Sequence, residues 1–120
     1  PKVAFRLMIF NARKRAEIFL TIDDLTGLWE NQNRRCAITN IAMTWGQGRI
    51  TPTSMSLDRI DPDAPYTVNN VRLVCHAINA FRGRMTDAEM LTMARAIVDN
   101  MSKSSREPSW QPHIVSSEAA

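Results

Sequence analysis

The sequence predicts a single α+β domain over residues 1–101, with two strands and a following helix at about residues 54–84. Three observations lead to this fold class. A chain of 120 residues can bury one modest core, but it is too short for two comfortable domains. Apolar and polar residues alternate over residues 55–60, and a second strand-like run covers 70–74. Helical spacing of apolar residues comes before and after these strands.

Two helices are expected before the strands. The first covers residues 3–19, where apolar residues occupy one side and basic residues crowd the other. The second begins after Thr21, because a threonine followed by Asp23 and Asp24 is typical of a helix start. This helix should end near residues 31–33, and a short strand or knuckle should follow it.

Turn and cap residues limit the remaining elements. Residues 61–65 read Asp-Pro-Asp-Ala-Pro, a composition that favours a turn between the two strands. Helical spacing resumes over 75–82 and stops at a glycine. A capping-box pattern at Thr86 opens another helix to about residue 101. The rest, residues 102–120, is rich in Ser, Pro and Glu and predicts a disordered tail.

Charge and composition narrow the function classes. The net charge of +3 and the isoelectric point near 9.3 permit a nucleic-acid partner without requiring one. The sequence contains no run of eighteen apolar residues, so no membrane-spanning segment is expected. Two cysteines cannot build a disulfide framework, and a cytoplasmic setting is therefore expected.

Polar residues with a potential for catalysis cluster in the strand–loop–strand–helix unit. Asp58 closes the first predicted strand, and Asn79 lies on the helix that follows the second. In a hairpin followed by a helix, the strand end and the helix face converge. Asp58 and Asn79 could then offer two oxygen ligands to one hard cation, and Mg²⁺ suits such a site because it completes its octahedron with water and phosphate.

This unit resembles the HNH (ββα-metal, His-Me finger) endonucleases. The resemblance spans about residues 10–95 and is most specific to a phage and bacterial group with an Asp-Arg-Ile-Asp motif. The matching positions are Asp58-Arg59-Ile60-Asp61, Tyr66, Asn70-Val71, Val74-Cys75, Asn79 and Arg82. The resemblance implies a DNA endonuclease that hydrolyses phosphodiester bonds with Mg²⁺ or Mn²⁺. It leaves open a homodimer and whether one or both strands are cut.

By the same resemblance, Asp58 and Asn79 are the metal ligands, and Asn70 holds the loop that positions the strand end. Arg82 stands where the family often has a lysine, close to a phosphate. The full set of residues expected to contact DNA is Arg59, Arg72, Arg82, Arg13, Lys14 and Arg15. For the basic run at residues 13–15, a solvated surface is an equally good interpretation.

The sequence departs from the family pattern in two places. Arg59 stands where the family has its general-base histidine, and an arginine stays protonated and cannot accept a proton. His76, three residues before Asn79, is the candidate substitute base, although a packed or surface histidine is the commoner case. Cys36 and Cys75 each lack the second cysteine of a Cys-x-x-Cys pair, so no structural zinc is expected.

The departure at Arg59 leaves a second function open. A catalytically silent relative would keep the fold and the basic surface and only bind DNA. The Asp58 and Asn79 pair favours the endonuclease, because a protein that only binds DNA has no need of both residues. A zinc-braced interaction module is disfavoured by the missing cysteines.

Overall fold

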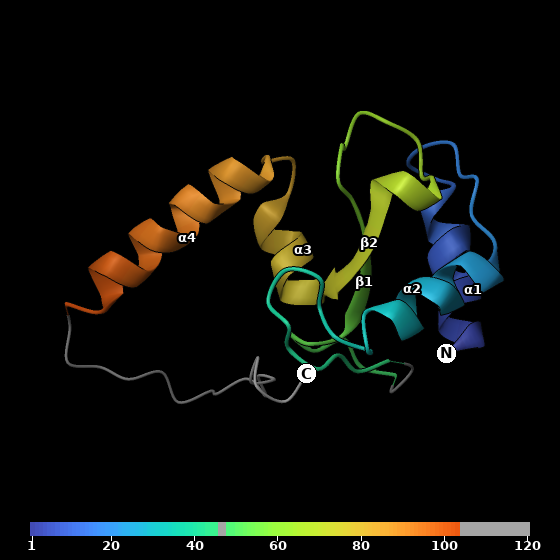
Figure 1. Cartoon of the computed structure of the whole chain (residues 1–120), viewed down its shortest axis with the longest axis horizontal. Coiled ribbons are helices and arrows are strands. Elements are labelled where there is room, and N and C mark those ends of the chain that lie inside the picture. The colour runs from blue at the N-terminus through green and yellow to red at the C-terminus, as the bar shows by residue number, and fades with distance from the viewer. Residues whose placement is uncertain (46–47, 104–120) are drawn as a thin grey trace.

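A two-stranded antiparallel hairpin lies at the centre of the computed structural model, which describes residues 1–45 and 48–103. The elements follow in the order α1 (Lys2–Ala12), α2 (Ile22–Asn31), β1 (Met55–Arg59), a 3-10 turn η1 (Val68–Asn70), β2 (Val71–Cys75), α3 (His76–Arg82) and α4 (Asp87–Met101). Figure 1 shows the hairpin between α1 and α2 on one side and α3 and α4 on the other. The predicted α+β class with a ββα centre is confirmed.

The hairpin register sets one cross-strand pair that matters for the site. Leu57 lies opposite Leu73, and Asp58 lies opposite Arg72. Successive residues of a strand point to opposite faces, so the leucine pair enters the core while the charged pair lies on the other face. The leucines join a core that also contains Phe5, Leu25 and Trp29 from the two N-terminal helices.

Local capping explains where α2 and α4 begin. The Thr21 hydroxyl accepts the Asp24 backbone N–H at 3.1 Å, and the Asp24 carboxylate accepts the Thr21 backbone N–H at 2.9 Å. Thr86 and Glu89 form the same reciprocal pair at the start of α4. At the end of α3, Gly83 takes a φ of 53°, which a residue without a side chain adopts at little cost.

The first helix is shorter than predicted. It ends at Ala12, whereas the sequence pattern suggested residues 3–19. The reason is tertiary: the Tyr66 backbone N–H donates to the carbonyl of Glu17 at 2.9 Å, and the Phe19 N–H donates to the carbonyl of Tyr66 at 2.8 Å. These bonds hold residues 17–19 in an extended conformation against the hairpin loop, and they leave the Phe19 side chain 63% exposed.

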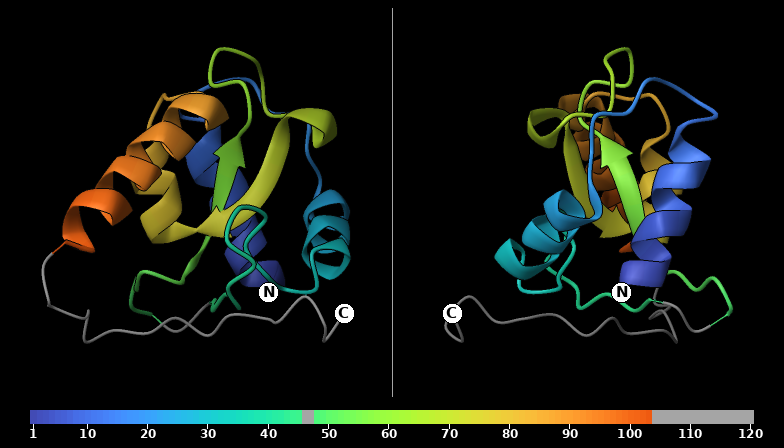
Figure 2. Two further views of the ribbon diagram at one scale, coloured as in Figure 1. Left: turned by 60° about the vertical axis from the view of Figure 1, so that its left-hand side comes forward. Right: turned by 90° about the vertical axis from the view of Figure 1, so that its right-hand side faces the viewer.

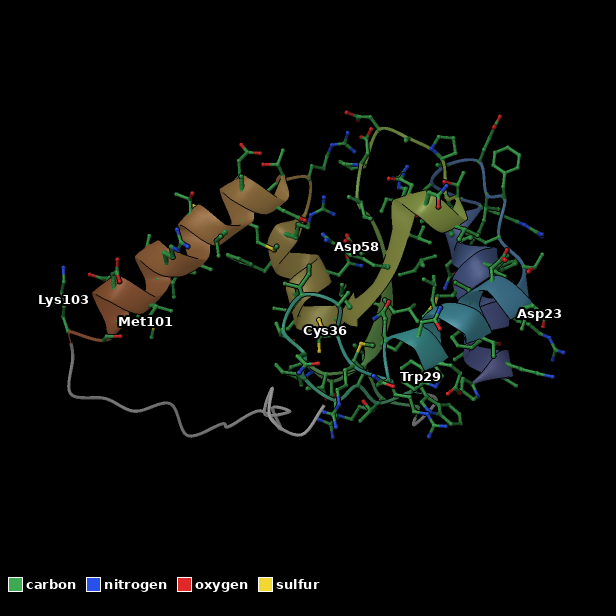
Figure 3. The ribbon with its side chains drawn as sticks, in the orientation of Figure 1. Asp23, Trp29, Cys36, Asp58, Met101 and Lys103 are labelled. Carbon is green, nitrogen blue, oxygen red and sulfur yellow. The ribbon has the colours of Figure 1, made fainter. Side chains whose placement is uncertain are left out.

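The knuckle after α2 is attached to β2 through hydrogen bonds. The Gln32 side chain donates to the carbonyl of Leu73 at 2.8 Å and accepts the Leu73 N–H at 3.0 Å, as a neighbouring strand would. The Cys75 N–H donates to the Cys36 sulfur at 3.3 Å. Both cysteines are buried free thiols, and burial raises the pKa of Cys75 to about 12. Figure 3 shows Cys36 close to this end of the hairpin.

Helix α4 projects from the rest of the molecule, so that only its first turns lie near α3 (Figures 1 and 2). Met90 is its buried residue, while Leu91, Val98 and Met101 are at least half exposed. No helix in residues 1–45 or 48–103 is long and apolar enough to cross a membrane. The tail predicted over 102–120 lies outside the described residues from 104 onward.

Candidate functional site

Asp58 is buried at the end of β1, with 3% of its surface exposed. Both of its carboxylate oxygens accept hydrogen bonds from arginines. Arg72 Nε donates to Oδ2 at 2.8 Å from the neighbouring strand, and Arg82 Nη1 donates to Oδ1 at 2.6 Å from α3. Charge-assisted bonds of this length are among the stronger interactions in a folded protein.

A second carboxylate completes this network. Asp87, the first residue of α4, accepts two hydrogen bonds from Arg72, at 2.9 and 2.6 Å, and its Oδ1 lies 3.4 Å from Arg82 Nε. We call Asp58, Arg72, Arg82 and Asp87 the ion cluster. The bonds from Arg72 lower the pKa of Asp87, and those to Asp87 and Asp58 raise that of Arg72. Two carboxylates and two guanidinium groups leave the cluster without net charge.

Arg82 turns inward rather than towards solvent. Its side chain is 2% exposed, and besides Asp58 it binds the backbone carbonyl oxygens of Arg59, at 2.6 Å, and Ile60. It therefore holds the chain where β1 ends. The predicted phosphate contact of Arg82 would require the side chain to leave these three partners. Arg72, also predicted to contact DNA, is similarly engaged, with a side chain that is 16% exposed.

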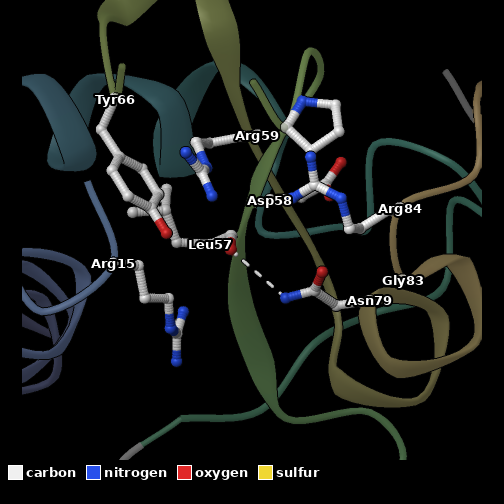
Figure 4. Close-up of a pocket in the computed structure, with 9 residues that line it drawn as sticks. Arg15, Leu57, Asp58, Arg59, Tyr66, Asn79, Gly83 and Arg84 are labelled. Carbon is white, nitrogen blue, oxygen red and sulfur yellow. Dashed lines mark hydrogen bonds between the residues drawn. The ribbon is translucent and has the colours of Figure 1, made fainter. Parts of the chain in front are cut away.

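A small cavity of about 130 Å³ opens beside the end of β1. Figure 4 shows it between the strand, the loop that follows it, α3 and the segment after α1. It is lined by Arg15, Leu57, Asp58, Arg59, Pro62, Tyr66, Asn79, Gly83 and Arg84. The structure thus brings together four of the residues predicted for the site, namely Arg15, Asp58, Arg59 and Asn79.

Two arginines give this pocket its charge. Arg59 lies over the ring of Tyr66, with 4.7 Å from the guanidinium carbon to the ring centre, and donates to the carbonyl of Ala64 at 3.1 Å. Arg15 is exposed, and its side chain forms no hydrogen bond or ion pair within the described part of the chain. A third lining arginine, Arg84, forms an exposed ion pair with Asp63. Arg15 and Arg59 therefore leave the pocket wall with an excess of positive charge.

Asn79 lies on the opposite wall, and its amide nitrogen is bound to β1. Nδ2 donates to the hydroxyl of Ser56 at 2.7 Å and to the carbonyl of Leu57 at 3.3 Å. Figure 4 shows the second bond and the amide oxygen on the other branch of the side chain. With its nitrogen fixed in this way, Asn79 offers the pocket one neutral oxygen.

Asn70 closes the loop between the strands. Its Oδ1 accepts the Asp61 N–H at 2.8 Å, and its Nδ2 donates to the carbonyl oxygens of Asp61, at 3.0 Å, and Pro65, at 2.9 Å. These three bonds tie the Asn70 side chain to the loop backbone at residues 61 and 65. Tyr66 lines the pocket and stacks against Arg59, a role that its place in the motif did not predict.

Besides Arg72, Arg82 and Asn70, three further predicted residues do not line the pocket. His76 is exposed at the first position of α3, where its backbone N–H donates to the carbonyl of Ser54 at 2.7 Å. Arg13 and Lys14 are exposed beyond the end of α1, with the Lys14 ammonium 4.8 Å from the centre of the Phe10 ring. The pocket contact of the basic run therefore comes from its third member, Arg15.

The arrangement does not fit the divalent cation expected at Asp58 and Asn79. Both oxygens of Asp58 are bound to guanidinium groups, whose positive charge opposes a dication at the same carboxylate. Asn79 supplies a single uncharged oxygen. Within residues 1–45 and 48–103, no group of three or more His, Cys, Asp or Glu side chains is placed to hold a metal ion. A cation at Asp58 would have to displace Arg72 or Arg82.

Comparison with known proteins supports the fold. No family model matches the chain, and no curated protein matches it. One solved structure that does is that of the rare-cutting HNH restriction endonuclease PacI, a protein described as perturbing its DNA. The match covers 84% of this chain and 78% of PacI, with a TM-score of 0.61 and 18% sequence identity. This chain has an HNH-like ββα fold.

Proposed function

We propose that this protein is a DNA endonuclease that hydrolyses phosphodiester bonds at the pocket beside the end of β1. The observation that carries the proposal is the convergence of Asp58, Arg59 and Asn79, from a strand end and a helix, on a pocket with an excess of positive charge. The likeness in fold to an HNH restriction endonuclease supports the same reading.

In this proposal the arginines bind the DNA and stabilise the negative charge of the transition state. Hydrolysis forms a bond from a water oxygen to phosphorus and breaks one P–O ester bond, with negative charge on the phosphoryl oxygens between the two events. The attacking water gives up a proton to solvent, and the leaving oxygen takes one up from solvent. Arg59 and Arg15 face the pocket where that charge would develop. The amide oxygen of Asn79 can accept a hydrogen bond from the attacking water and so orient it. Arg59 keeps its proton and supplies charge, not base catalysis.

A silent DNA-binding relative is the second candidate, and one specific observation favours it. The carboxylate that the family uses for catalysis is here neutralised by Arg72 and Arg82. A site closed in this manner can still bind a phosphate through Arg15 and Arg59.

The experiment that separates the two candidates is cleavage of supercoiled plasmid with Mg²⁺ or Mn²⁺, with EDTA as the control. The endonuclease predicts nicked or linear plasmid, and a loss of about 10²-fold in rate for Asn79→Ala, which is what misplacing a reacting group by about 1 Å can cost. His76→Ala tests whether that histidine acts as a base. Arg95→Gln, an exposed charge on α4, is the matched control.

DNA binding without cleavage would contradict the endonuclease. Intact plasmid with every metal, from protein that still retards plasmid on a gel, would assign the protein to the silent class. Arg59→His then restores the family's base in place. If the missing base alone silences the protein, this variant should gain cutting, since a general base typically contributes about 10²–10⁴-fold. If the neutralised Asp58 silences it, the variant should stay inactive, because Arg72 and Arg82 still bind that carboxylate.

A further inference from the structure

The carboxylates of the site lie in the ion cluster, where arginines neutralise them, while its arginines without a carboxylate partner in the described part of the chain line the pocket. The carboxylate of Asp58 is the negative group that would attract a cation, and it is fully occupied by Arg72 and Arg82. The fourth member, Asp87, shares the same two arginines. The cluster as a whole is neutral, so it has no net attraction for a cation.

The remaining charges favour an anion. Arg84 is matched by Asp63, whereas Arg15 and Arg59 have no carboxylate partner within the described residues. The nearby Asp61 is not among the residues that line the pocket, and its carboxylate accepts the backbone N–H of Asp63. The wall of the cavity therefore carries two uncompensated guanidinium groups and no uncompensated carboxylate.

Arg59 is also held in place before any ligand arrives. Its stacking on Tyr66 and its bond to the carbonyl of Ala64 restrict the side chain. Tyr66 in turn is 2% exposed and is fixed by its backbone bonds to the chain after α1. A guanidinium that is already ordered loses less entropy when it binds a phosphate than a free one would.

We infer that the pocket is an anion site, which binds one backbone phosphate of DNA through Arg15 and Arg59 without a divalent cation. The inference rests on the proposed interaction with DNA and deepens it, because it separates binding from any metal requirement of cleavage. Asp58 is then a positioning residue. It holds Arg82 under the strand end, and Arg82 fixes the carbonyl groups of Arg59 and Ile60.

The test is fluorescence anisotropy with a labelled DNA duplex, measured in EDTA and in Mg²⁺ over a series of salt concentrations. We expect the same affinity in EDTA as in Mg²⁺ at matched ionic strength. A plot of log affinity against log salt concentration has a negative slope. This slope should become shallower by about 1 for Arg15→Gln and by about 1 for Arg59→Gln, because each variant removes one phosphate contact. The Arg15 side chain has no hydrogen-bond or ion-pair partner among residues 1–45 and 48–103, so its variant tests the site even if Arg59→Gln unfolds.

Arg95→Gln removes the same charge from α4 and is the control, for which the slope should stay unchanged. Binding that requires Mg²⁺ or Mn²⁺, or equal slopes for Arg15→Gln and Arg95→Gln, would overturn the inference. The plasmid assay is independent of this inference. Binding in EDTA, together with plasmid that stays intact in every metal, would refute the endonuclease alone. Cutting by a protein whose DNA binding requires a metal would refute the anion site alone.

Discussion

Asp58 and Arg59 are neighbours at the end of β1, yet their surroundings are opposite. Asp58 is buried, and both of its oxygens are bound by arginines from β2 and α3. Arg59 is partly exposed, stacked on an aromatic ring, and has no carboxylate partner among the described residues. One charge stabilises the fold, and the other is available to a ligand. A motif of adjacent charged residues thus does not by itself distinguish a structural ion pair from a binding group.

The largest loss of stability should follow from breaking the buried ion pair between Asp58 and Arg82. Arg82→Met leaves Asp58 buried with one partner in place of two, and removing one partner of a buried ion pair costs about 3–5 kcal/mol. Urea denaturation should therefore show a much lower midpoint. Arg84→Met, two residues away in an exposed pair, should change stability by no more than about 0.5 kcal/mol. Equal losses for the two variants would show that the contrast in burial has no energetic meaning.

A smaller effect is expected at Asp87, which is half exposed and therefore screened. Asp87→Asn should cost about 1 kcal/mol at pH 7, the upper end for such pairs. Because Arg72 lowers the pKa of Asp87 in the folded state, this stabilisation is present above the ordinary aspartate pKa and is lost as the pH falls through the lower folded value. Denaturation at pH 7 and at about pH 3 should show the gap between wild type and variant shrinking. A gap that grows in acid would contradict the pairing with Arg72.

The smallest effect on stability is predicted for the exposed arginine of the pocket wall. Arg15→Gln should leave the free energy of unfolding within about 0.5 kcal/mol of wild type, because the side chain has no partner in the described fold. Thermal unfolding followed by circular dichroism measures this directly. A clear loss of stability would show that Arg15 has a structural role and would weaken its assignment to the anion site.

Most of the elements were predictable because their signals are local. Thr21 and Thr86 carry complete capping boxes, and both helices begin where the sequence indicates. The strands and α3 follow within a residue or two of expectation. The first helix was overestimated, since the pairing of residues 17–19 with Tyr66 joins segments almost fifty positions apart. No periodicity in one segment can reveal a partner at that distance.

The site was predictable in its residues more than in its contacts. The motif positions led to Asp58, Arg59 and Asn79, and the structure places them around one pocket. The complete ion cluster could not be read from the motif, because its second carboxylate, Asp87, belongs to a helix outside the motif and binds Arg72 from there. Arg15 was one of three basic residues with equal claims, and only the turn after α1 distinguishes it. The metal roles of Asp58 and Asn79 and the base role of His76 stay predictions.

The position of Asp87 has a consequence for the order in which the protein can be completed during synthesis. The strand end is set by residues up to Arg82, but the second carboxylate of the ion cluster belongs to the first turn of α4. A nascent chain that has not yet released residue 87 from the ribosome has two guanidinium groups facing one carboxylate. Charge balance around β1 is reached only once α4 has begun to form, so α4 takes part in completing the centre of the fold.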